Sequence, residues 1–139
     1  MTPECRRLAQ QAFAAIQPFA DELGMLFYSR LFELDSTLRG LFKHDLANQA
    51  HSLMRMLQLA IEGLDAPEES TRALHNLGLR HQDYGVQPEQ YATVRAALLW
   101  TFAHALGPAF TPEVEAALTE ILTSITDQMQ AASTGIPRL

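Results

Sequence analysis

The stretch L-G-L-R-H-Q-D-Y-G-V, residues 77–86, places a histidine at the end of an apolar helical ladder and then interrupts the helix with a glycine. Leu74, Leu77, Gly78 and His81 follow one another at i, i+3, i+4 and i+7, so they share one face of a helix. An apolar face of this kind turns toward the interior, and His81 turns inward with it. The simplest interpretation of His81 is a core histidine whose ring is hydrogen-bonded to a carbonyl. The residues around His81 must therefore show whether the histidine has a chemical role.

The residues around His81 favour a chemical role. Gly78 lies one turn earlier and removes a side chain, which lets a flat group approach the helix, and Gly85 lets the chain leave it. Tyr91 follows ten residues after His81, in the first turn of the next expected helix, and faces the same interior. A phenol beside an imidazole can order the ring, fix its tautomer and hold it for a metal.

Length, composition and charge describe one acidic domain. The chain has 139 residues, of which 47% are hydrophobic, and a formal net charge of −6. A compact chain of this size buries roughly 68% of its unfolded surface, which is enough for one sizeable core. The basic residues are scattered, so we expect no nucleic-acid partner and no membrane partner. We expect a single domain over residues 1–139, with a frayed tail at about 133–139.

The first residues and the cysteine count narrow the class further. The longest apolar run, residues 96–103, is far below the ~18 residues of a membrane-spanning helix, and M-T-P-E-C-R-R does not resemble a signal peptide. We therefore expect a cytoplasmic protein. Cys5 is the single cysteine, which excludes an internal disulfide, a Cys-rich zinc site, a cysteine-held iron–sulfur cluster and a C-x-x-C-H haem attachment. Any cofactor must be held without thiolates.

Apolar residues recur with a helical period almost everywhere, and no stretch alternates as a half-buried strand does, so the predicted class is all-α. The expected helices cover about 3–17, 21–34, 46–64, 66–81, 87–107 and 111–129, with a capped turn over 35–42. Leu34 is expected on the inward face of the second helix. Trp100 is expected in the core, because its helix is apolar nearly all round.

Several segments together resemble one family. The run L-G-L-R-H-Q-D-Y-G-V-Q-P-E-Q-Y-A-T-V-R-A-A-L-L, residues 77–99, resembles the proximal segment of globins. More specifically, the run resembles bacterial single-domain haemoglobins and the globin domain of flavohaemoglobins, with neuroglobin a more distant relative. F-Y-S-R-L-F at 27–32 is similar to their second-helix motif, and L-F at 41–42 matches the phenylalanine that packs on the haem. The resemblance spans roughly residues 5–130 and implies a globin fold around haem b.

The resemblance also implies a role for individual residues. His81 would be the iron ligand, and Tyr28, from the second-helix motif, would face the bound gas. The spacing typical of these globins, 32 residues before the histidine, reaches Gln49 as the distal residue, with Leu53 four residues further over the iron. The residues implied to contact the haem are Phe42, Leu53, Tyr91, Val86, Val94, Leu98 and His81 itself.

Each of these assignments has a simpler alternative. Tyr28 could be an ordinary tyrosine on a helix surface, and Phe42 could serve the core alone. Gln49 on a solvated face would have no function, so its assignment depends on spacing. The other histidines compete poorly for a metal because their positions turn them away from the ladder or put them in a loop: His44, His51, His75 and His104.

The function implied by the resemblance is reversible binding of O₂, and also of CO and NO, at a five-coordinate ferrous haem. Tyr28 would donate a hydrogen bond to the gas, with Gln49 as a second donor or as the residue that orients Tyr28. Two alternatives remain open. One is a nitric oxide dioxygenase served by a separate reductase, because no G-x-G-x-x-G nucleotide motif occurs in this chain. The other is a haem-based ligand sensor.

The chain departs from the flavohaemoglobin-like pattern on the last helix. Those relatives carry a glutamate there that joins the proximal tyrosine and histidine and makes the imidazole more electron-rich. The same spacing in this chain reaches Ser133 or its neighbourhood, where no acid occurs. A weaker proximal push favours reversible binding over peroxidase-like chemistry.

Overall fold

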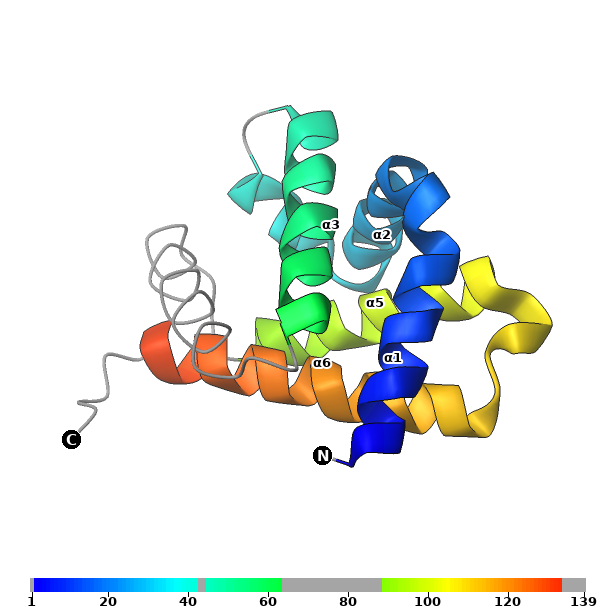
Figure 1. The fold of residues 1–139 in the computed structure, drawn as a ribbon. Coiled ribbons are helices and arrows are strands. Elements are labelled where there is room, and N and C mark those ends of the chain that lie inside the picture. The colour runs from blue at the N-terminus through cyan, green and yellow to red at the C-terminus, as the bar shows by residue number, and fades with distance from the viewer. Residues whose placement is uncertain (1, 43–44, 64–88, 134–139) are drawn as a thin grey trace.

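The computed structural model describes residues 2–42, 45–63 and 89–133, the last five without their side chains. Its α-helices are α1 (Pro3–Ile16), α2 (Ala20–Leu34), α3 (Leu46–Glu62), α5 (Gln90–Leu106) and α6 (Pro112–Ser133). Short 3₁₀ turns fill three connections: η1 (Gln17–Phe19), η2 (Ser36–Leu41) and η4 (Gly107–Ala109). Every regular element within these ranges is helical, which confirms the predicted all-α class (Figure 1). The expected helix over 66–81 lies outside the described residues.

The helices form two crossing layers around one core. Helices α5 and α6 run antiparallel, joined through η4, and α1 packs across both (Figure 1). Helix α2 crosses both α3 and α5. Helices α2 and α3 carry the predicted distal residues, and α5 carries Tyr91 in its first turn.

Local sequence signals explain where the helices begin and end. The Thr2 hydroxyl accepts a hydrogen bond from the Cys5 amide at 3.1 Å, which caps α1, and Pro3 occupies its first turn. Gly107 ends α5 with a φ of 53°, a conformation that favours glycine. Pro18 and Pro108 lie in 3₁₀ turns that the helical period did not predict, because one tight turn is too short to show a period.

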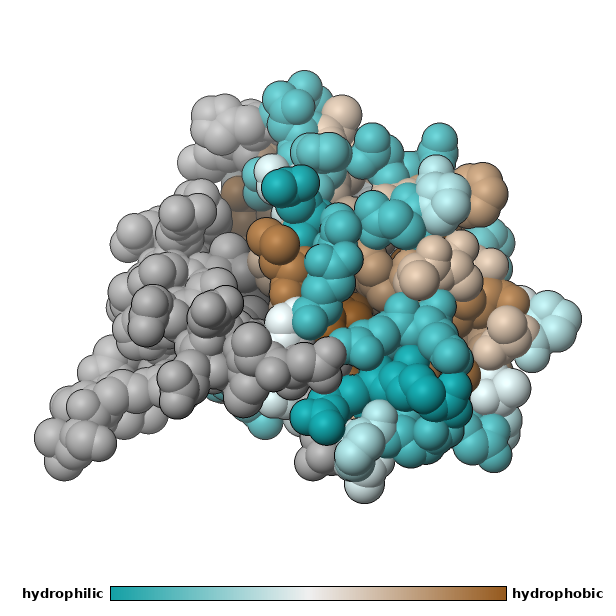
Figure 2. Space-filling model, in the orientation of Figure 1, coloured by the Kyte–Doolittle hydropathy of each residue, from teal (hydrophilic) through white to brown (hydrophobic). Residues whose placement is uncertain are grey.

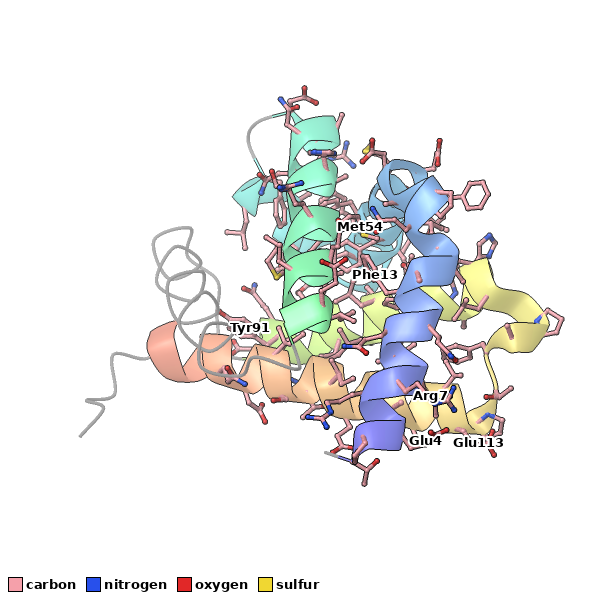
Figure 3. All side chains as sticks on the ribbon, viewed as in Figure 1. Glu4, Arg7, Phe13, Met54, Tyr91 and Glu113 are labelled. Atoms are coloured by element: carbon pink, nitrogen blue, oxygen red, sulfur yellow. The ribbon has the colours of Figure 1, made fainter. Side chains whose placement is uncertain are left out.

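Apolar side chains from every α-helix fill the core. Phe13 of α1 and Phe102 of α5 pack with ring centroids 6.4 Å apart, and Figure 3 shows Phe13 and Met54 directed into the interior between their helices. The face in Figure 2 is mostly hydrophilic, with scattered hydrophobic patches where described side chains reach the surface. In the described part of the chain, no helix is long and apolar enough to cross a membrane.

Two predicted core positions are wrong. Leu34 is 43% exposed because it is the last residue of α2, and the chain then turns away into the extended backbone of Asp35. Trp100 is half-buried at the border of α2 and α5. Its indole has the Arg30 guanidinium 5.1 Å from the ring centroid and the His104 ring stacked at 5.5 Å. The Arg30 guanidinium and the His104 ring therefore cover part of the indole that apolar core side chains would cover in a fully buried tryptophan.

Helices α2 and α3 approach each other closely at Gly24. A Cβ atom built on Gly24 would lie 2.9 Å from the Ala50 Cβ and 3.0 Å from the Ala50 carbonyl oxygen. Backbone cannot give way as a flexible side chain can, so this crossing has no room for a methyl group at position 24. Tyr28 lies one turn beyond Gly24, and Gln49 adjoins Ala50, so the crossing sets the separation of the two helices that carry the predicted distal residues.

We expect Gly24→Ala to lower the free energy of unfolding by about 1–3 kcal/mol, because the added methyl overpacks the crossing. Urea unfolding followed by circular dichroism measures the change. Gly40→Ala is the matched control, since a Cβ at Gly40 meets nothing within 4 Å and α2 and α3 do not pack there. Equal stability of the Gly24→Ala variant and the parent protein would contradict the close crossing.

Candidate functional site

Tyr28 is the centre of an aromatic cluster. It is 5% exposed, and its ring makes edge contacts with Phe27 at 4.9 Å and with Phe42 at 5.0 Å between centroids. Phe32 adds a third contact at 6.0 Å and also touches Phe42 at 5.8 Å. Edge-to-face aromatic pairs are each worth about 0.5–1.5 kcal/mol beyond their buried area. The structure therefore brings Tyr28 and Phe42 together and holds the phenol in a fixed direction, which rules out a surface tyrosine.

The environment of Tyr28 keeps its hydroxyl protonated. Burial of the ring raises the pKa of the phenol well above its ordinary value, because the charged phenolate would lose its solvation. No hydrogen bond from this hydroxyl to another described residue is present. Tyr28 is thus a neutral phenol whose proton is not donated to any other residue that the structure describes.

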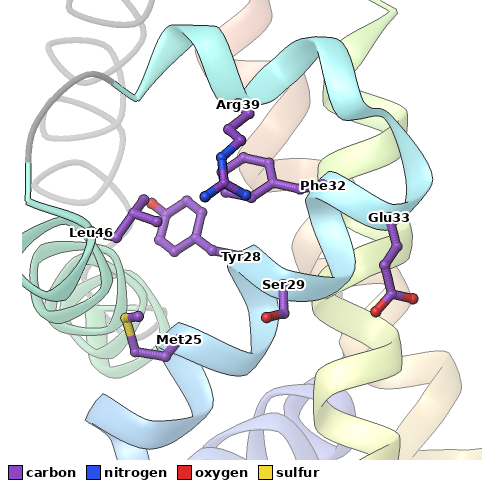
Figure 4. Close-up of a pocket in the computed structure, with 7 residues that line it drawn as sticks. All are labelled: Met25, Tyr28, Ser29, Phe32, Glu33, Arg39 and Leu46. Carbon is purple, nitrogen blue, oxygen red and sulfur yellow. The ribbon is translucent and has the colours of Figure 1, made fainter.

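A cleft of about 440 Å³ lies along one side of the Tyr28 ring (Figure 4). Seven residues of α2, η2 and α3 line it: Met25, Tyr28, Ser29, Phe32, Glu33, Arg39 and Leu46. In Figure 4 the Tyr28 ring extends across the cleft toward Leu46, and the Arg39 side chain overlies Phe32. Tyr28 consequently has packed rings on one side and open volume on the other.

Gln49 and Leu53 are positioned by the capped start of α3. The Asp45 carboxylate accepts a hydrogen bond from the Ala47 amide at 2.9 Å, and the Gln49 amide donates to the Asp45 carbonyl at 3.1 Å. Both predicted residues are half-buried, and Leu53 packs against the core. Gln49 therefore does not lie on a fully solvated face, although no hydrogen bond of its side chain to another described residue is present.

Tyr91 is 2% exposed in the first turn of α5, and its hydroxyl has no hydrogen-bond partner among the described residues. An unpaired buried hydroxyl costs about 1–3 kcal/mol, and folded proteins rarely leave one without a partner. Leu98 is buried two turns further along the helix, and Val94 is half-buried against the core. The Tyr91 phenol is therefore ready to bind a group that the described residues do not supply.

The predicted iron ligand His81 and the haem contact Val86 lie outside the described residues, as do His44 and His75. The two described histidines have other partners. His51 Nδ1 lies 3.0 Å from a carboxylate oxygen of Asp21 at the surface, and His104 stacks on Trp100.

Gln128 was missed by the sequence analysis. Its side-chain oxygen is buried without a hydrogen-bond partner among the described residues, while its amide nitrogen donates to the Ser124 hydroxyl at 3.2 Å. A signal was available, because Gln128 follows the buried Ile125 by three residues and Ile121 by seven, which places a polar residue on the apolar ladder of α6.

Comparison with known proteins gives a consistent result. Residues 25–129 match the family model described as Globin. The chain is 28% identical over 123 residues to a flavohemoprotein of Rhizobium meliloti, a match that covers 86% of this chain and 28% of that protein. It is also 28% identical over 120 residues to neuroglobins of Tetraodon nigroviridis and Danio rerio, covering 76% of each chain. The chain thus spans little more than a quarter of the flavohemoprotein's length.

The raised pKa of Tyr28 predicts a loss of stability at alkaline pH. The folded state keeps the phenol proton above pH ~10, where the unfolded chain releases it, so the free energy of unfolding falls as pH rises. The contribution of one such group approaches about 1.4 kcal/mol per pH unit. We expect Tyr28→Phe to remove this part of the slope in urea unfolding between pH 8 and 11. Identical slopes in the two proteins would contradict the burial of Tyr28.

Proposed function

The chain belongs to the globin family, and from this membership we propose that it binds O₂ reversibly at a five-coordinate ferrous haem, with Tyr28 and Gln49 on the gas-binding side. Globins bind haem and, through it, diatomic gases, which gives the general activity. The haem b type, the choice of O₂ over CO or NO and a cytoplasmic location are parts of the proposal. The observation that carries it is Tyr28, a buried, protonated phenol whose proton no described residue uses.

The residues of the chain fit a haem. The Tyr91 hydroxyl is a buried polar group that needs a partner from beyond the described residues, and the proposed role for His81 supplies one. His81 would ligate the iron, and the proposed haem contacts are Phe42, Leu53, Tyr91, Val86, Val94 and Leu98. Once bound, the haem iron supplies the open coordination position at which a diatomic gas binds. The protein's own part is to hold His81 on one side and a hydrogen-bond donor on the other.

Tyr28 would set the affinity for the gas. The haem would present the gas as a partly negative acceptor, and a hydrogen bond from Tyr28 to such a charged group would contribute about 1.5–3 kcal/mol, or roughly ten- to a hundredfold in affinity. The Phe27 and Phe42 contacts already fix the ring, so little conformational entropy is lost when the hydroxyl donates. Gln49 would donate a second hydrogen bond or orient the phenol. We therefore expect tight binding with slow release.

A second candidate is a nitric oxide dioxygenase. It is favoured by the similarity to a flavohemoprotein, which is 28% identical to this chain over 123 residues. Electrons for repeated turnover would then come from a separate reductase. Nitrate production that depends on an added reductase would select this function, and a stable O₂ complex without turnover would select reversible binding.

The visible absorption spectrum tests the site as a whole. We expect protein purified with haem and reduced without air to show a five-coordinate ferrous spectrum, which changes to a lasting oxygenated one on exposure to O₂. His81→Gly should lose this spectrum and regain it with added imidazole, while His51→Gly, a change at an exposed histidine, should not affect it. Failure to bind haem after reconstitution would overturn the proposal.

We expect Tyr28→Phe to increase the O₂ dissociation rate at least tenfold, because the variant keeps the packed ring and loses only the donor. Stopped-flow displacement of O₂ by CO measures the rate. Thr119→Ala removes an exposed hydroxyl on α6 and serves as the control. An unchanged rate in Tyr28→Phe would remove Tyr28 from the gas-binding role.

A further inference from the structure

The cleft beside Tyr28 carries a cation that the described residues leave unpaired. Arg39, in η2, lines the cleft and forms no ion pair with another described residue, whereas Glu33, an acid of the same lining, pairs with Arg30 at 3.2 Å. The Arg39 side chain is exposed, and Figure 4 shows it extending from η2 toward the rings of Phe32 and Tyr28. Because Arg30 offsets the charge of Glu33, the cleft presents a positive charge to a molecule that enters it.

The Arg39 guanidinium is held in place by an aromatic ring. Its Cζ atom lies 5.6 Å from the centroid of the Phe32 ring, which is a cation–π contact. A guanidinium over a ring can still direct the N–H groups of its edge at a partner, and these groups match the two oxygens of a carboxylate. Phe32 is itself in contact with Tyr28 and Phe42, so little side-chain freedom is left to lose when a ligand binds.

The other walls of the cleft suit an aromatic body. Met25, Phe32 and Leu46 supply apolar surface, and the Tyr28 ring adds a second aromatic wall. Met25 is 43% exposed, so its thioether is available to a ligand, and thioethers and aromatic rings both pack favourably against a further ring. The volume of about 440 Å³ lies within the range of small-molecule sites. The cleft therefore combines one cationic group with surfaces that favour a flat, apolar ring.

We propose that this cleft binds a small aromatic carboxylate, whose carboxylate group pairs with Arg39 and whose ring packs against Phe32 and Met25. A single negative charge matches the unpaired guanidinium, whereas a doubly charged phosphate would place excess negative charge near Glu33. A neutral or cationic head group would leave Arg39 without a partner. The proposal does not depend on the proposed function, because its test measures the cleft residues and involves no bound O₂.

Titrations followed by ¹H–¹⁵N NMR test the site with compounds that differ only in their head group: 3-phenylpropionate, 3-phenylpropan-1-ol and 3-phenylpropylamine. The protein is used as purified, with dithionite and carbon monoxide to keep any bound haem diamagnetic. We expect 3-phenylpropionate to shift the amide resonances of Met25, Ser29 and Arg39 with a Kd on the order of 1 mM. The alcohol and the amine should bind about tenfold more weakly. Equal binding of all three compounds, or unshifted cleft resonances, would overturn the proposal.

Charge variants test the role of Arg39. We expect Arg39→Gln to weaken 3-phenylpropionate binding about tenfold, because it removes the charge-assisted hydrogen bonds. Glu33→Gln should have the opposite effect and strengthen binding, because it removes a like charge from the cleft wall. Arg55→Gln is the matched control, since it removes the same charge from an exposed position of α3 that does not line the cleft. A Kd that is unchanged in Arg39→Gln, with the spectrum of a folded protein, would overturn the proposal.

Discussion

The close crossing of α2 and α3 is the constraint on which the rest of the site depends. At Gly24 the two backbones approach so closely that a methyl group would overlap the Ala50 carbonyl. The crossing sets the spacing of the two helices that carry the proposed distal residues, because Tyr28 follows Gly24 by one turn and Gln49 adjoins Ala50. A larger residue at the crossing would separate the helices and change the distance between donor and ligand. The smallest residue in the chain thus determines where one of its most important side chains lies.

The two sides of the proposed site are stabilised by different physical interactions. On the proposed gas-binding side the Tyr28 ring is fixed by its edge contacts with Phe27 and Phe42. On the other side the Tyr91 hydroxyl is buried with no hydrogen-bond partner among the described residues, so it would gain free energy from any group that supplies one. Aromatic packing therefore fixes the orientation of Tyr28, whereas the Tyr91 hydroxyl, which has no partner among the described residues, can bind a further polar group.

Much of this arrangement could be predicted from the sequence, and the exceptions have physical causes. Helical periodicity located α1, α2, α3, α5 and α6, and motif resemblance found Tyr28 and Phe42, which the structure brings into contact. Periodicity failed for Leu34 because it cannot show where the neighbouring helices end. It also failed for Trp100, because a cation and an imidazole cover the ring in place of apolar side chains. Gln128 was not predicted because helical periodicity identifies the apolar residues of a buried face and not a polar residue that lies among them. His81 and Val86 stay predictions.

The position of Trp100 gives the protein an internal optical reporter. It is the only tryptophan in the chain, so all indole fluorescence comes from one place, the border between α2 and α5. Arg30 reaches this ring from α2, while His104 stacks on it from within α5. Emission intensity and wavelength therefore respond to any sliding of α2 along α5, and α2 is the helix that carries Tyr28. Movements of α2 relative to α5 can be followed in real time in the native chain without attaching a dye.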